Sequence, residues 1–477
     1  MVRSLATFGG PTLHGALQFF GHHVRGTDPL SAPDERALRR TAIAVCASAF
    51  ALAVGLSGCA NAQRSPAAAP PPAVDIDAQN CRDLIAALIA DSPDSAERDF
   101  SERVRTGLPP PLLRVMWHGI ERKHGALGSW RVVKRDSDYG KDRFTLELQF
   151  ANSIMYALVV FEPAGKIIGL FFSDAPHDKP QAVDPPDPRG KEVSVSVGSL
   201  ELQGNLTLPP EVGAARIPGA VLIAGSGAND RDETVLNAKP FRDLAFSLAA
   251  RGIATLRYDK RTFAHPELFV AEKSPTVETE TIADAVAAIG VLRSRPELDP
   301  QRLFVIGHSL GALLAPEIAS RSGDIAGLVL LAAPGRPVLE VTLEQLRNRA
   351  AKASDLAPLE ARVRGLPQLA ATELLFGMPA SYWQDLDKRD EMQIARDLGR
   401  PVLLLRGGSD QNVFAIDQAR WVQALSGKVP LEAATLPGLS HLLVPADTAT
   451  TGSPHVPPDV SARIAAFINA PPASAAR

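Results

Sequence analysis

The chain has few cysteines and almost no net charge. Its 477 residues include only three cysteines, Cys46, Cys59 and Cys81. None of them forms a C-x-x-C pair or a Cys/His spacing, so neither a metal site nor a disulfide framework is indicated. A formal net charge of −3 gives no electrostatic reason to expect a nucleic-acid partner. We expect no metal ion, no cofactor and no nucleic acid.

Nucleotide-binding signatures are also missing. The sequence has no G-K-[ST] and no G-x-G-x-x-G, so binding of a nucleotide is poorly supported. The apolar fraction of 45% is ordinary for a globular protein. The 40 prolines gather in segments that read as linkers. We therefore expect folded domains separated by tethers.

A targeting segment precedes the folded part. Arginines in 36–40 lead into the apolar residues 41–56, which are few for a membrane-spanning helix and typical of a signal peptide. The end of this segment, Leu-Ser-Gly-Cys at 56–59, resembles a bacterial lipobox. The resemblance implies cleavage before Cys59, a lipid on its sulfur and, with Ala60 next, attachment to the outer membrane facing the periplasm. The alternatives are an ordinary secretory signal and a membrane helix.

Composition and periodicity predict the domain organisation. The expected segments are an N-terminal extension with the signal, a Pro/Ala linker, a small α+β domain, a Pro-rich linker, a large α/β domain and a tail. In the same order, their residues are 1–59, 60–77, 78–174, 175–191, 192–470 and 471–477.

The small domain shows helices first and strands afterwards. Apolar residues recur at helical intervals in 81–89 and 112–120, and four strand-like runs follow between 130 and 172. This order resembles the cystatin-like, nuclear-transport-factor-like domains that precede some bacterial hydrolases. The domain shows no catalytic constellation, and we interpret His118 and His124 as surface or cap residues.

The large domain shows a hairpin-like pair of strands and then strands that alternate with helices. Continuous apolar strands separated by helical segments predict a mostly parallel sheet covered on both faces. Residues 336–398 interrupt the alternation with further helical spacings. We call them the lid segment, because we expect an insertion after the sixth strand of such a sheet to lie over the site.

The residues Gly307-His308-Ser309-Leu310-Gly311 stand between an apolar strand and a predicted helix. Strand, G-x-S-x-G and helix is the context of a nucleophile elbow, in which the serine hydroxyl stands exposed at a helix N-terminus. The turn is so tight that Ser309 must take strained backbone angles and the glycines relieve the crowding. A solvated serine in a Gly-rich turn is the alternative. We expect His308 to be structural.

A serine nucleophile needs a base and an acid that orients the base. Enzymes with such a nucleophile elbow carry the three residues in the chain order Ser, Asp, His. Ser309, Asp410 and His441 have this order, and Asp410 and His441 stand just past the ends of predicted strands. Each has a plainer reading, Asp410 as a turn residue and His441 as a loop histidine. Asp417 is the fallback acid, although a helix should already be running there.

The oxyanion of an acyl-transfer intermediate needs two backbone N–H donors. The first is expected from Leu310, directly after the nucleophile. The second is expected from the Gly-rich loop at 225–232, where Ser226 is the first choice and Gly227 the next. A simple Gly-rich turn is the alternative interpretation of this loop.

Several motifs together resemble the bacterial α/β-hydrolase esterases related to dienelactone hydrolase and the prolyl oligopeptidase catalytic domain. They are Gly-Ser-Gly-x-x-Asp-Arg-Asp at 225–232, Arg-Tyr-Asp-Lys-Arg-Thr at 257–262, the elbow and Gly-Leu-Ser-His-Leu at 438–442. Relatives usually carry His-Gly-Ser-Gly, and Ala224 stands here in place of the histidine. We interpret the charged residues of the first two motifs as an ion-pair network, with recognition of a substrate carboxylate by Arg231 or Arg261 as the alternative.

The sequence thus predicts a lipid-anchored serine esterase that acts on a small acyl ester. A serine peptidase or amide hydrolase, acyl transfer to an acceptor other than water, and a non-catalytic envelope binding protein remain alternatives. The sequence gives no indication of a protein partner.

Overall fold

The computed structural model describes residues 76–138, 141–173, 190–211, 213–235, 238–265, 275–348, 353–376, 378–446 and 454–470. All of these ranges belong to one of the two units into which the chain divides. The predicted signal, Cys59, nearly all of the Pro/Ala linker and the C-terminal tail lie outside the described residues.

The N-terminal part consists of helices followed by a four-stranded antiparallel sheet in the order β1-β2-β3-β4. The order of elements agrees with the sequence, but the short elements between the two long helices were not expected. The elements are α1 (Ile76–Ile89), α2 (Pro93–Ala96), η3 (Glu97–Asp99), α3 (Glu102–Gly107), α4 (Pro110–His124), β1 (Leu127–Asp138), β2 (Lys141–Phe150), β3 (Ile154–Phe161) and β4 (Ile167–Ser173).

Helix α4 packs its apolar face on this sheet. The Trp117 ring lies 5.7 Å from the Phe150 ring and 6.1 Å from the Phe172 ring, measured between centroids. The interpretation of His124 as a surface or cap residue was wrong, because its side chain is buried beside Phe150 and its Nδ1 hydrogen-bonds to Ser153. The apolar contact surface extends to the last residue of the helix, which periodicity did not indicate.

The second sheet has eight strands in the order β14-β13-β10-β9-β7-β8-β6-β5. Strands β5 and β6 pair antiparallel, β6 pairs antiparallel with β8, and the other neighbours are parallel. The bounds are β5 (Gly190–Val197), β6 (Leu200–Thr207), β7 (Ile217–Ile223), β8 (Ala254–Tyr258), β9 (Leu298–His308), β10 (Gly327–Leu331), β13 (Val402–Gly407) and β14 (Leu431–Leu436). The predicted mostly parallel sheet is confirmed.

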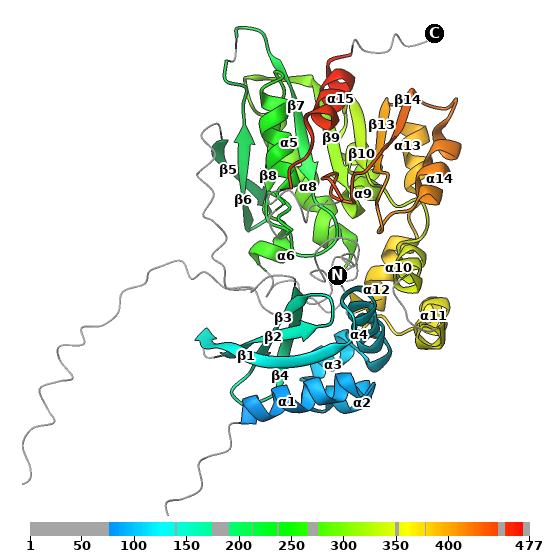
Figure 1. Ribbon diagram of the computed structural model, residues 1–477. Coiled ribbons are helices and arrows are strands. Elements are labelled where there is room, and N and C mark those ends of the chain that lie inside the picture. Colours follow the sequence, from blue (N-terminus) through cyan, green and yellow to red (C-terminus); the bar gives the residue numbers. More distant parts are fainter. Residues whose placement is uncertain are drawn as a thin grey trace, which may run out of the picture. The chain divides into compact units, whose positions relative to one another are not determined.

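Helices cover both faces of this sheet (Figure 1). One face carries α8 (Ala283–Arg293) and α9 (Leu310–Ser322), while the other carries α5 (Pro240–Ala249) and α15 (Pro458–Asn469). Apolar side chains that alternate along the central parallel strands β7, β9, β10 and β13 face these two layers, so these strands are buried on both sides. Together with α14 (Ala415–Leu425), these elements give the expected α/β-hydrolase architecture.

The lid segment contains helices, as expected, and also a two-stranded hairpin that periodicity did not indicate. Its last helix, α13, packs against α9 and so belongs to the layer that covers the sheet. The elements are α10 (Val338–Arg347), η5 (Ala353–Asp355), α11 (Ala357–Arg364), η6 (Leu366–Gln368), β11 (Leu374–Leu375), β12 (Met378–Pro379), α12 (Ala380–Asp387) and α13 (Glu391–Leu398).

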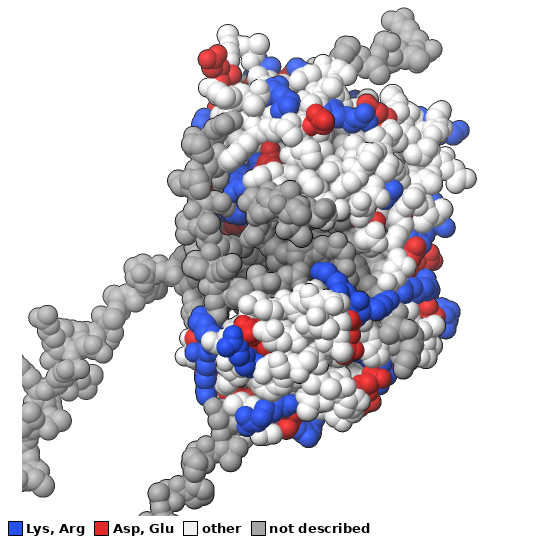
Figure 2. All heavy atoms as spheres, in the orientation of Figure 1, with Lys and Arg blue, Asp and Glu red and all other residues white. Residues whose placement is uncertain are grey.

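Charge is mixed on the molecular surface. On the face drawn in Figure 2, basic and acidic side chains stand near one another, which agrees with the near-zero net charge. Among the described helices, none has the length and apolar character needed to cross a bilayer. Within the described ranges, no group of three or more His, Cys, Asp or Glu side chains could hold a metal ion.

The contact between α13 and α9 contains a buried acid. Glu391 is 3% exposed, and its Oε2 accepts the Glu317 N–H at 3.0 Å. The pKa of Glu391 is raised to about 8, chiefly by burial; the hydrogen bond from the Glu317 N–H lowers this pKa, the charge of Glu317 raises it and Arg389 lowers it. The carboxyl therefore keeps its proton in the folded protein at pH values where the unfolded chain has lost it.

The buried acid makes stability depend on pH. Between about pH 4.5 and pH 8 the native state binds more protons at Glu391 than the unfolded state, so the free energy of unfolding falls as pH rises. We expect Glu391→Gln to raise the melting temperature at pH 8 by several degrees and to change it little near pH 5. Thermal unfolding across this range measures the effect, with the exposed Glu340→Gln as control. If the melting temperatures of the parent and of Glu391→Gln change with pH in the same way, the expectation is wrong.

Candidate active site

The turn between β9 and α9 has the geometry of a nucleophile elbow. Ser309 adopts φ 53° and ψ −117°, a left-handed conformation that costs a residue with a side chain about 1–3 kcal/mol. Its N–H donates to the Leu331 carbonyl at 2.8 Å. A Cβ at Gly307 would lie 2.2 Å from the Gly311 carbonyl oxygen, and one at Gly311 would lie 2.2 Å from the Ile223 oxygen. Only glycine fits at these two positions, so the sequence pattern follows from the close approach of the backbone.

The predicted acid and base lie next to each other. Asp410 follows β13, its side chain is fully buried, and its Oδ2 lies 2.9 Å from His441 Nδ1. The other carboxylate oxygen, Oδ1, accepts the N–H groups of Asn412 at 2.7 Å and Val413 at 3.0 Å. Because a carboxylate accepts, Nδ1 carries the proton and Nε2 is left as the basic nitrogen.

The fallback acid Asp417 serves other contacts, and so does His455, a histidine that does not follow a predicted strand end. Both oxygens of Asp417 lie 2.9 Å from the guanidinium of Arg336, and its Oδ1 also accepts the Gly335 N–H. His455 is paired with Asp243 at 3.1 Å. Asp417 therefore fixes the start of the lid segment to α14, and of these two aspartates Asp410 is the one that contacts His441.

A second histidine links three loops of the site. His308 Nε2 lies 2.9 Å from the His441 carbonyl oxygen, which can only accept, so this nitrogen donates. His308 Nδ1 lies 2.9 Å from Glu233 Oε1, and the same oxygen accepts the Gly225 N–H at 2.8 Å. Since His308 adjoins Ser309, this bridge joins the elbow to the loops of His441 and Gly225. Glu233 was not among the predicted residues, because sequence does not distinguish a buried carboxylate from the exposed ones of a charged run.

The Gly-rich loop lies against the nucleophile. A Cβ at Gly225 would stand 3.1 Å from the Ser309 Cβ. The Gly225 carbonyl accepts hydrogen bonds from Asn229 Nδ2 at 2.9 Å and from Lys260 Nζ at 3.1 Å. In a planar trans peptide the N–H points opposite to the C=O, so the Ser226 N–H points away from these buried donors.

The other predicted donor is the Leu310 N–H, in the first turn of α9, where helical amides have no partner within the helix. Within the described residues, neither the Ser226 nor the Leu310 amide donates a hydrogen bond. Both predicted donors are thus available to a developing oxyanion, and buried side chains support the loop in which Ala224 replaces the usual histidine.

The charged motifs form the ion-pair network that the sequence predicted. Arg231 binds Asp259 through two nitrogens, at 3.1 and 2.9 Å, and Arg231 Nη1 also contacts Glu192. Arg257 pairs with Asp232, and Arg261 pairs with Asp284. Because Arg231 and Arg261 are each paired with a carboxylate of this chain, the structure does not favour a role for them in recognising a substrate carboxylate.

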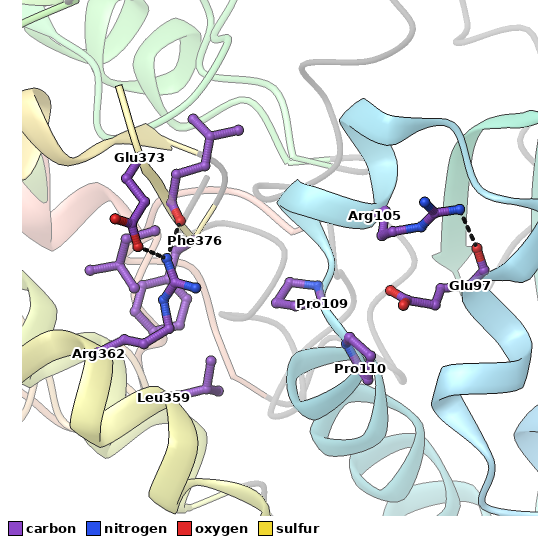
Figure 3. A pocket seen from close by; sticks show the side chains of 10 residues that line it. Glu97, Arg105, Pro109, Pro110, Leu359, Arg362, Glu373 and Phe376 are labelled. Atoms are coloured by element: carbon purple, nitrogen blue, oxygen red, sulfur yellow. Dashed lines mark hydrogen bonds and ion pairs between the residues drawn. The ribbon is translucent and has the colours of Figure 1, made fainter. Parts of the chain in front are cut away.

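A cavity of about 350 Å³ lies away from these residues, between the N-terminal part and the lid segment (Figure 3). Arg362 on its wall donates to Glu373 Oε1 at 2.8 Å and to the Leu374 carbonyl at 2.9 Å. On the opposite wall, Arg105 donates to the Glu97 carbonyl at 3.5 Å. None of the predicted site residues lines this cavity.

Comparison with known proteins places the chain in a family. A family model described as Alpha/beta hydrolase family matches residues 220–451, which include Ser309, Asp410 and His441. Esterase EstD of Thermotoga maritima is 34% identical over 376 residues, covering 76% of this chain and 87% of the relative. The chain belongs to the alpha/beta hydrolase family. It is therefore a hydrolase, as the sequence predicted, while the resemblance of the N-terminal part to cystatin-like domains stays a prediction.

Solved structures show more distant likenesses. Est1E from Butyrivibrio proteoclasticus is 15% identical with a TM-score of 0.39, covering 58% of this chain and 97% of that protein. A puromycin-hydrolyzing peptidase from Mycobacterium tuberculosis is 16% identical with a TM-score of 0.42, covering 72% of this chain and 47% of that protein. These likenesses are too distant to bear on the chemistry of the site.

Substitution by asparagine should have opposite effects at Asp410 and at Asp417. Asp410→Asn should lower kcat by about 10⁴-fold, because the amide cannot hold the tautomer that leaves Nε2 basic. Asp417→Asn should keep kcat within a few-fold but destabilise the protein by about 3 kcal/mol, because it breaks a buried pair with Arg336. Hydrolysis of p-nitrophenyl butyrate and thermal unfolding measure the two effects. A loss of turnover confined to Asp417→Asn would assign the acid to that residue instead.

Proposed function

We propose that this hydrolase is a serine carboxylesterase whose catalytic triad is Ser309, His441 and Asp410. The observation that carries the proposal is the hydrogen bond between Asp410 Oδ2 and His441 Nδ1 beside a strained serine elbow. Buried, doubly anchored Asp410 orients the imidazole, and the elbow presents Ser309 at the N-terminus of α9. The similarity to Esterase EstD supports an ester as the substrate.

The proposed reaction assigns a role to each of these donors and acceptors. Ser309 Oγ attacks the acyl carbonyl carbon while its proton passes to His441 Nε2, and the carbonyl oxygen becomes an oxyanion. The N–H groups of Ser226 and Leu310 stabilise this charge. The ester C–O bond then breaks, and the leaving alcohol takes the proton from Nε2. Water, deprotonated by His441, hydrolyses the acyl-enzyme in the same way and releases the acid.

The serine supplies the direct test of this proposal. Ser309→Ala should lower kcat for p-nitrophenyl butyrate by about 10³-fold or more and abolish labelling by a fluorophosphonate probe, because both need the Oγ nucleophile. Thermal unfolding checks that the variant folds. Near-parental turnover in Ser309→Ala would refute the assignment.

The substrate panel distinguishes the remaining enzymatic alternatives. The parent should hydrolyse p-nitrophenyl acyl esters of short chain length faster than matched p-nitroanilides, since an amine leaves less readily than a phenolate. Faster cleavage of the anilides would favour the peptidase interpretation. Products formed with an added alcohol would indicate acyl transfer.

We further propose that the protein is a lipid-anchored protein of the bacterial outer membrane, attached through Cys59 and facing the periplasm. The support is the sequence Leu-Ser-Gly-Cys after a basic and apolar segment. A diacylglyceryl chain on the sulfur would hold the enzyme at the membrane surface.

Labelling with radioactive palmitate tests the anchor. The parent expressed in a Gram-negative host should incorporate the label and sediment with outer membranes, whereas Cys59→Ala should do neither. Cys81→Ala is the matched control, because Cys81 is buried in α1 and should leave labelling unchanged. Incorporation into Cys59→Ala equal to that of the parent would contradict the anchor.

A further inference from the structure

The Gly225–Ser226 peptide group, which carries the Ser226 N–H, is held at its carbonyl oxygen by a buried lysine. Lys260 is 4% exposed, and its Nζ donates to the Gly225 carbonyl at 3.1 Å. Because the peptide group is planar, the direction of the Gly225 carbonyl also fixes the direction of the Ser226 N–H. Asn229 Nδ2 donates to the same carbonyl at 2.9 Å. Whatever fixes Lys260 therefore helps to fix the direction of the expected oxyanion donor.

Lys260 is in turn fixed by a buried glutamate. Its Nζ lies 2.6 Å from Oε1 of Glu280, which is 2% exposed. Glu280 belongs to η4 (Glu278–Ile282), a π-helical turn that leads into α8. Such turns are rare and are frequent at functional sites. A buried lysine and carboxylate cost desolvation energy and often contribute less than apolar residues of the same size, so stability alone is a weak explanation for this pair.

The second oxygen of Glu280 is bound by the lid segment. Tyr382, on α12, donates its Oη–H to Glu280 Oε2 at 2.6 Å and is 4% exposed. Burial, and then the charge of Glu280, raise the pKa of Tyr382, so the phenol stays protonated and remains the donor. The neighbouring lid residue Asp385 also accepts the Val277 N–H at 3.2 Å, one residue before η4.

We propose that Tyr382, Glu280 and Lys260 are positioning residues that couple the place of the lid segment to the direction of the Ser226 N–H. This proposal rests on the proposed esterase function. Three consecutive hydrogen bonds join α12 to the Gly225 carbonyl, and every side chain in the series is buried. When α12 moves away, Glu280 loses a donor, Lys260 shifts, and the Gly225–Ser226 peptide turns away from the oxyanion.

The coupling makes the lid segment part of the catalytic step. A lid that only encloses the substrate would change binding, whereas a lid that orients an oxyanion donor changes the stability of the tetrahedral intermediate. The loss of Tyr382 Oη should therefore lower kcat and leave KM nearly unchanged.

Tyr382→Phe removes the hydroxyl and keeps the ring. In the full chain, this variant should lower kcat for p-nitrophenyl butyrate by about 10-fold, a fraction of the 10²–10³-fold effect of removing an oxyanion donor outright. The inhibition constant of phenylboronic acid, which forms a tetrahedral adduct with a catalytic serine, should rise by a similar factor. KM should change less than about two-fold, because ground-state binding does not use the oxyanion donor.

Gln384→Met is the matched control on the same helix. Gln384 Nε2 donates to the Leu366 carbonyl at 2.9 Å and the Leu369 carbonyl at 3.1 Å, so its hydrogen bonds stay within the lid segment. This variant should lower the melting temperature without the change in kcat and in boronate inhibition. Glu280→Gln breaks the same series of hydrogen bonds at a second point. The double variant Glu280→Gln/Tyr382→Phe should lower kcat by no more than the more damaging single substitution does.

The outcomes separate this coupling from the proposed function. If Tyr382→Phe and Glu280→Gln both keep kcat within two-fold of the parent, and turnover still depends on Ser309, the coupling is wrong and the esterase proposal stands. The coupling is also wrong if Tyr382→Phe and Gln384→Met lower kcat equally and neither variant changes the inhibition constant of phenylboronic acid. Turnover that persists in Ser309→Ala overturns the esterase proposal and the coupling with it.

Discussion

The backbone of Ser309 is forced into a left-handed conformation because β9 must turn into α9 within one residue. Its N–H bonds to the end of β10, and the flanking glycines let the helix pass within contact of β7. The strain of about 1–3 kcal/mol persists only because these contacts overdetermine the turn. The other parts of the site are arranged around this fixed serine.

His308, the residue before the serine, connects the elbow to two other loops of the site. His308 reaches the backbone of His441 on one side and Glu233 on the other, and Glu233 also holds the Gly225 amide. The loop of His441, the elbow of Ser309 and the Gly-rich loop are thus joined by one buried imidazole. Such a network is costly if any partner is removed, since each buried polar group depends on the next.

Electrostatic pairing explains the many charged residues near the site. Lys260 holds the Gly-rich loop and pairs with Glu280, whereas Arg231 and Arg261 pair with Asp259 and Asp284. Lys260 holds the Gly225 carbonyl, and the Ser226 N–H points away from this lysine. The loop that follows Ala224 therefore receives support from Lys260, a side chain distant in sequence.

Patterns of local origin were predictable. The G-x-S-x-G turn, the parallel strands and the order Ser309, Asp410, His441 follow from close backbone approach, apolar runs and strand ends, all of which short segments encode. Two errors have a common cause: His124 was taken as a surface residue and the short helices at 93–107 were missed. Both depend on contacts between separate elements, which periodicity does not report: His124 packs beside Phe150, and the short helices contact α1, α4 and β4.

By itself the sequence determined the family, the elbow and the order of the acid and the base, because these rest on residue types at fixed spacing. Only the tertiary structure decided that Asp410 rather than Asp417 contacts His441, that Glu233 joins His308, and that Tyr382 reaches Lys260 through Glu280. The physical reason is that a hydrogen bond needs partners within about 3 Å. These partners are 20 to 102 positions apart and reach that distance only after the chain has folded.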